Sequence, residues 1–110
     1  MTDPATFLAL ADRCEQAAAP DQKAVMLAVV DALGLPSKQH YLIVRMIEIG
    51  AYESAAIALV PEGWTWGKFF GGSAECVSIS GPSILFERGL SDKPALAICA
   101  AALRARAAMG

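Results

Sequence analysis

Side chains that could do chemistry are few in this chain of 110 residues. His40 is the only histidine, and no acid and nucleophile at a suitable spacing accompany it as a catalytic triad requires. Asp12 and Glu15 share a helical face beside a basic residue, which is typical of a solvated surface. Glu62 lies in a Pro-Glu-Gly turn, where a carboxylate could bind a partner or simply be exposed. We therefore expect no catalytic residue and no enzymatic activity.

The cysteines and glycines do not form a cofactor motif. Cys14, Cys76 and Cys99 are too far apart in sequence for a zinc site, and an odd number cannot pair completely in disulfides. Each has apolar neighbours, so we expect all three to be packed, reduced thiols. Gly71-Gly72 is too short for a phosphate loop, and no Gly-Lys-Ser/Thr sequence follows it. The sequence predicts no metal and no cofactor.

Aromatic residues at alternate positions are the best candidate for recognition. In a strand, side chains two residues apart point to one face, and a glycine on the opposite face, Gly67, would leave room for a helix. If the aromatic face is covered, it belongs to the core; if it is open, it is an apolar patch of the kind that marks a protein partner. Both interpretations stay open. The candidate partner-binding residues are Glu62, Trp64, Trp66, Lys68 and Phe70.

Composition narrows the function classes further. The chain is 55% hydrophobic, its formal net charge is -2, and it has no basic excess to bind nucleic acid. Its apolar runs are shorter than the roughly 20 residues of a membrane span, and no secretory leader is visible at its start. We expect one domain, residues 1–110, in the cytoplasm. The mean hydropathy of +0.44 reflects many alanines and is consistent with an apolar assembly surface, so a homo-oligomer is a further expectation.

The first half of the sequence predicts helices. Asp3 can cap a helix that opens at Pro4, and a second helix opens near Pro20 and ends at Gly34. The run 24–30 is apolar on all sides, which predicts a central, buried helix. Residues 37–49 are ambiguous: their β-branched residues favour a strand, whereas a 3.6-residue pattern that persists for three turns favours a helix, and we predict a helix.

The second half predicts a sheet and a last helix. Short strands at 63–70, 76–80 and 84–88 are separated by glycine-containing turns, which indicates an antiparallel meander. A helix at 94–108 follows, with one apolar stripe along it. The predicted fold class is α+β, a three-layer α-β-α sandwich with N-terminal helices, a three-stranded meander and an alanine-rich C-terminal helix.

Three segments carry a resemblance to a known family. They are Ser54-Ala-Ala-Ile-Ala-Leu-Val-Pro-Glu-Gly-Trp64 with Trp66, the alanine-rich stretch Pro94–Ala107, and Ala18-Ala-Pro-Asp21. Together they resemble the phage α–β–α sandwich domain family of small bacteriophage and prophage proteins. Residues 36–50 have no counterpart in that resemblance, and Lys93 stands where the family tends to have a capping threonine, so Ser91 or Asp92 must supply the cap.

The resemblance implies a three-layer fold and a phage origin, and it brings no catalytic residue. Two functional hypotheses remain beside that of an enzyme, which would need a polar cleft around Glu62 or His40. The chain is an accessory protein that binds a host or phage protein, including a component of host defence, or it is a minor virion or assembly component that homo-oligomerises.

Overall fold

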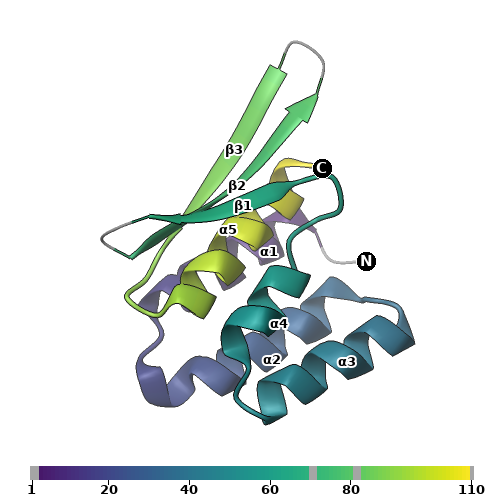
Figure 1. Ribbon diagram of the computed structural model, residues 1–110, viewed down its shortest axis with the longest axis vertical. Coiled ribbons are helices and arrows are strands. Elements are labelled where there is room, and N and C mark those ends of the chain that lie inside the picture. The colour runs from purple at the N-terminus through teal and green to yellow at the C-terminus, as the bar shows by residue number, and fades with distance from the viewer. Residues whose placement is uncertain (1–2, 70–71, 81–82, 110) are drawn as a thin grey trace.

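The computed structural model describes residues 3–69, 72–80 and 83–109 and has an α+β fold. A three-stranded antiparallel sheet of order β1-β2-β3 follows four helices and precedes a fifth (Figure 1). The predicted class, meander and C-terminal helix are confirmed. The elements are α1 (Pro4–Gln16), the short 3-10 helix η1 (Ala19–Asp21), α2 (Gln22–Leu33), α3 (Ser37–Glu48), α4 (Tyr52–Ala58), β1 (Thr65–Phe69), β2 (Ser73–Ser80), β3 (Ser83–Leu90) and α5 (Pro94–Ala108).

The helices of the first half begin and end where their local signals indicate. Asp3 Oδ1 accepts a hydrogen bond from Thr6 N at 2.8 Å, which caps α1. Gly34 ends α2 with φ +60°, a left-handed conformation that favours glycine. Residues 37–48 of the ambiguous segment form the predicted helix, α3, with Ile43 and Ile47 buried one turn apart. The helical period therefore outweighed the strand propensity of its β-branched residues.

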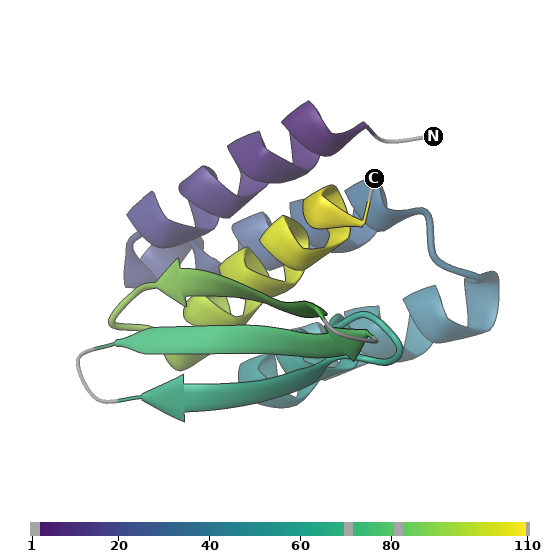
Figure 2. The same cartoon turned by 90° about the horizontal axis from the view of Figure 1, so that it is seen from above.

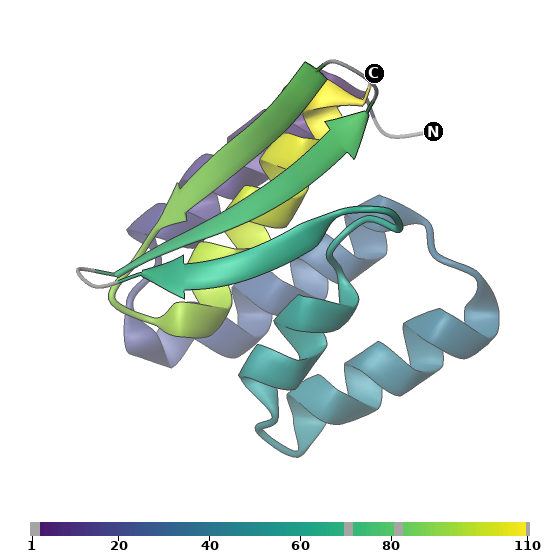
Figure 3. The same cartoon turned by 45° about the horizontal axis from the view of Figure 1, so that its top comes forward.

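Helix α5 is the centre of the molecule. Its residues from Ala95 to Leu103 are all buried, on every side of the helix. Figure 3 shows the sheet along one side of α5, with the other helices around the rest. The predictions that the run 24–30 forms the central helix and that α5 has a single apolar stripe are therefore wrong. Helix α2 buries Val25, Met26, Val29 and Val30, and it exposes its remaining face.

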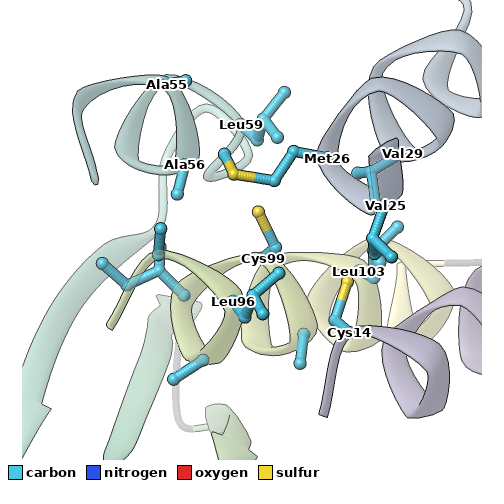
Figure 4. Close-up of a cluster of buried hydrophobic side chains, with 14 of the residues drawn as sticks. Cys14, Val25, Met26, Val29, Ala55, Ala56, Leu59, Leu96, Cys99 and Leu103 are labelled. Atoms are coloured by element: carbon cyan, nitrogen blue, oxygen red, sulfur yellow. The ribbon is translucent and has the colours of Figure 1, made fainter. Parts of the chain in front are cut away.

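The largest part of the core lies between α5 and the helices. In Figure 4 the Cys99 side chain points from α5 toward Met26 of α2 and Leu59 at the end of α4. Cys14 of α1 packs in the same cluster near Leu103. All three cysteine side chains of the molecule are fully buried, which confirms the expectation that they are packing residues.

The layers are the sheet, then α5 with α1, then α2, α3 and α4 (Figure 1). Helix α5, rather than the sheet, occupies the middle. Small side chains allow this close approach. A Cβ added at Gly89 of β3 would lie 2.8 Å from Ala101 N and 2.9 Å from Ala100 Cβ. Because only a glycine fits there, Gly89 sets which face of β3 meets the helix.

The pairing of the strands then shows on which face of the sheet each side chain lies. Gly89 pairs with Ala74, and Ala74 pairs with Lys68, so these three residues share the face that packs on α5. Gly67 pairs with Glu75 on the opposite, outer face. The prediction that Gly67 makes room for a helix is therefore wrong, since the helix approaches at Gly89.

Candidate interaction surface

The residues proposed from the aromatic pattern of β1 lie toward the helices. Trp66 pairs with the buried Cys76, and Lys68 pairs with the buried Ala74, so both side chains are on the α5 side of the sheet. Trp66 is nevertheless 39% exposed, because β1 is an edge strand. Phe70 lies outside the described residues. The pattern correctly predicted a strand whose alternate residues share one face.

Trp64 and Glu62 precede this strand and have different surroundings. Trp64 is half-buried against the side chain of Cys76 and three alanines of α5. Glu62 is exposed in the turn before it, and Trp64 N closes that turn by donating to Pro61 O at 3.1 Å. Trp64 therefore contributes mainly to the core, whereas Glu62 and part of Trp66 are accessible to a partner.

Lys68 is held by an ion pair rather than free. Its Nζ lies 2.8 Å from Glu53 Oε1 of α4, with both side chains about half exposed. Two hollows border this pair. One of about 550 Å³ is lined by Glu53 and the N-terminal ends of α2, α4 and α5, and one of about 290 Å³ is lined by Lys68, Gly72 and the start of α5. The pair thus joins β1 to α4 across a grooved surface.

The outer face of the sheet also exposes large apolar side chains. Phe86 is 58% exposed and Leu90 54% exposed, and Val77, which pairs with Phe86 on the neighbouring strand, is partly buried. Among the described residues no helix lies over this face (Figures 2 and 3). An ion pair crosses it, with Arg88 Nη2 3.0 Å from Glu75 Oε1. We call Val77, Phe86 and Leu90, with this ion pair, the open sheet face.

The sequence analysis did not select the open sheet face. A signal was present, because residues 84, 86 and 90 are apolar at even positions of one strand. Their neighbour Gly89 has the opposite parity and is the residue that must meet α5. Phe86 and Leu90 have the opposite parity to Gly89, which indicates that these two side chains point away from the helix.

A polar cluster fixes the far end of β3 to the helices. Arg104 of α5 donates from Nη1 and Nη2 to the two carboxylate oxygens of Glu15 at 2.6 and 2.8 Å, and from Nη2 to Asp12 Oδ1 at 3.0 Å. Its Nη1 also donates to Arg88 O at 2.7 Å, and Glu15 Oε2 accepts from Leu90 N at 2.8 Å. The hydrogen bond from Arg104 lowers the pKa of Glu15, and the same bond raises the pKa of Arg104. Asp12 and Glu15 thus bind Arg104 rather than forming a merely solvated pair.

The three cysteine thiols are poor nucleophiles in these surroundings. Burial raises the pKa of Cys14 to about 12 and of Cys76 to about 11, and it raises the pKa of Cys99 well above its usual value. Thiols of this kind are protonated at neutral pH and are poor nucleophiles. His40 Nε2 lies 3.8 Å from Asp31 Oδ1 at the surface. Within the described residues no group of three or more His, Cys, Asp or Glu side chains could hold a metal ion.

Comparisons with protein-family models, with curated proteins and with solved structures found no match to this chain. The phage family resemblance therefore stays a prediction. In the part of the chain that the structure describes, no helix is both long and apolar enough to span a membrane.

Proposed function

We propose that this chain is a protein-binding module without catalytic activity and that its open sheet face is the main contact surface. The observation that carries the proposal is the exposure of Phe86 and Leu90 on a face that no described helix covers. Large apolar side chains grouped on an exposed face are typical of protein-binding surfaces. The Glu75–Arg88 ion pair supplies polar contacts beside them. In this proposal, Glu62 and the exposed part of Trp66 form a second, smaller contact area.

The proposed partner is a host or phage protein in the cytoplasm of an infected or lysogenic bacterium. This part of the proposal rests on the resemblance of residues 54–66 and 94–107 to phage α–β–α sandwich proteins. A component of host defence is the partner class that such an accessory protein would bind. The unreactive thiols and the surface position of His40 are consistent with action by binding rather than by chemistry.

The test is affinity capture with a matched pair of variants. Val77→Lys places a charge beside Phe86 on the open sheet face, on the middle strand, whereas Leu42→Lys places one on α3, where Leu42 is 49% exposed. We expect the wild-type chain and the Leu42 variant to retain the same partner, and the Val77 variant to lose it by at least tenfold in affinity when the two purified proteins are titrated. Circular dichroism checks that both variants are folded. If the purified partner binds the Val77 variant as tightly as wild type, the open sheet face is not the contact surface.

A second candidate function, a minor virion or assembly component, is favoured by the two sheet edges that β1 and β3 present. Such edges can pair with further strands and so build oligomers. Mass spectrometry of purified phage particles from the source strain, compared with whole-cell lysate, separates the two functions. A stoichiometric amount in particles supports the structural role, and its absence from particles with abundance in lysate supports the binding module.

A further inference from the structure

The C-terminal part of β3 has outward backbone groups that are bonded to side chains. β3 is an edge strand, with β2 on its inner side. Leu90 N donates to Glu15 Oε2 of α1 at 2.8 Å, and Arg88 O accepts from Arg104 Nη1 of α5 at 2.7 Å. Both backbone groups therefore point away from β2, on either side of Gly89, where β3 meets α5. An added strand would take these same two groups for its own hydrogen bonds.

Glu15 and Arg104 supply the groups that a neighbouring strand would supply. A strand offers a carbonyl oxygen to the free N–H and an N–H to the free carbonyl. An ionised carboxylate only accepts hydrogen bonds and a guanidinium only donates them, so Glu15 replaces the carbonyl of that strand and Arg104 replaces its N–H. The two side chains thus occupy the place of a strand with the correct polarity at both positions.

Bonds within the cluster hold the two side chains in this position. Arg104 bonds both carboxylate oxygens of Glu15, at 2.6 and 2.8 Å, and it bonds Asp12 Oδ1 at 3.0 Å. The side chains of Glu15 and Arg104 are each 21% exposed, whereas that of Asp12 is 65% exposed. Glu15 and Arg104 belong to α1 and α5, which pack against each other. The groups that close the edge are therefore fixed by the helical core.

The space beside this edge is accessible from solvent. A hollow of about 570 Å³ lies there, lined in part by Phe86, Arg88 and Leu90 of β3 and by Glu15 and Arg104. Another strand could approach β3 through this hollow. The two side chains are therefore what excludes it.

We propose that Glu15 and Arg104, which we call the edge-closing pair, keep further strands from adding to the C-terminal part of β3. The pair bonds only backbone atoms of β3, so the side chains of the open sheet face stay accessible. Assembly through strand pairing must then use β1 or the start of β3. The inference does not rest on the proposed function. The two can fail separately, because Val77→Lys on the middle strand leaves the edge-closing pair unchanged.

The experiment removes both members of the pair and measures self-association of the full chain. Glu15→Ala combined with Arg104→Ala frees the Leu90 N–H and the Arg88 carbonyl, and neither shielded charge is left without its partner. Sedimentation velocity over a low to high micromolar series gives the association constants of the double variant and of wild type. We expect the constant to rise by roughly tenfold or more in the double variant, because the freed groups accept a strand of another copy.

A third substitution separates edge closure from a general loss of stability. Leu90→Pro, added to the double variant, removes the freed N–H, and proline is tolerated on an edge strand. We expect association to return to the wild-type value. Leu90→Ala in the same background is the matched control. It also removes the leucine side chain but keeps the N–H, so we expect association to stay high.

Two single variants complete the set. Asp12→Ala removes one partner of Arg104 and leaves both backbone bonds in place. Val29→Ala weakens the buried core in α2 and leaves the edge-closing pair intact. We expect both to associate as wild type does. Circular dichroism and urea denaturation check that each variant is folded. If the double variant is unfolded, Glu15→Ala alone still frees the Leu90 N–H and should associate more strongly than Asp12→Ala.

Three results would overturn the proposal. A folded double variant, or Glu15→Ala in its place, that associates no more strongly than wild type shows that the pair does not close the edge. Association that persists after Leu90→Pro shows that groups other than the freed N–H carry it. Association of Val29→Ala as strong as that of the double variant shows that lost stability is the cause.

Discussion

Helix α5 and the β2–β3 hairpin use apolar residues in opposite ways. In α5 the side chains are mostly alanines, and they are buried on every side. In the hairpin the exposed apolar side chains are large, and Leu85, Phe86 and Leu90 are each about half exposed. The small side chains are thus buried and the large ones exposed, because α5 is packed closely on all sides whereas the hairpin extends beyond the helices. The alanines that raise the mean hydropathy are therefore mostly buried in α5, and the exposed apolar surface of the hairpin comes from larger side chains.

The largest expected effect breaks the close contact between the two regions. Gly89→Ala adds a Cβ that would lie within 3 Å of the α5 backbone at Ala101 N, so β3 must separate from the helix. Overpacking of this kind costs about 3 kcal/mol or more when backbone must move. We expect a large loss in the free energy of unfolding or no folded protein, measured by urea denaturation. A variant as stable as wild type would show that β3 does not depend on close packing with α5.

A smaller effect is expected at the cluster that joins the two regions. Because the Arg104 hydrogen bond lowers the pKa of Glu15 in the folded state, ionised Glu15 stabilises the fold above the unfolded pKa of about 4.5. That contribution is lost as the pH falls through the lowered folded pKa. Glu15→Gln removes the titration, and it also leaves Arg104 with a weaker partner.

We therefore expect Glu15→Gln to lower the free energy of unfolding at pH 7 by about 1–3 kcal/mol, as for a lost bond to a charged group. The difference in melting temperature between this variant and wild type should become smaller as the pH is lowered from 7 to 3. The exposed Glu48→Gln is the control. A difference that is constant with pH would show that Glu15 is not stabilised by ionisation.

The smallest effect on stability is expected on the open sheet face. Leu90→Ser changes a side chain that is 54% exposed and leaves the backbone bond to Glu15 in place. We expect the free energy of unfolding to change by no more than about 0.5 kcal/mol, as for most surface substitutions. Chemical denaturation at low protein concentration measures this without a contribution from self-association. A loss above 2 kcal/mol would mean that Leu90 is part of the core.

The sequence was most informative about elements whose signals are local. The cap at Asp3, the left-handed Gly34 and the helical period of residues 37–49 each depend on neighbours within a few positions. The order of strands also followed from short turns. These features determined the α+β class before any long-range contact was known.

It was harder to predict which face of each strand meets the helices and which helix lies at the centre of the molecule, because both depend on contacts between residues far apart in sequence. Alternation in β1 showed that Trp66 and Lys68 share a face, but the pairing with Cys76 and Ala74 decides that this face meets α5. In α5 the residues between Leu96 and Leu103 are mostly alanines, which occur on both buried and exposed helix faces. The sequence therefore predicted a helix buried along one stripe, whereas the helix is buried on every side. Arg104 and Glu15 are 89 positions apart, and no local pattern predicted their contact.

The position of α5 in the chain has a consequence for synthesis. Residues before Pro94 leave the ribosome ahead of the helix on which α1, α4 and the sheet pack. Until then the inner face of β2, with Ala74 and Cys76, has no partner to cover it. A nascent chain in that condition exposes apolar surface and unpaired strand edges, which are the features that chaperones bind and that promote aggregation. Folding of this molecule therefore has to wait for its last helix, and the yield of folded protein depends on how the chain is protected during that interval.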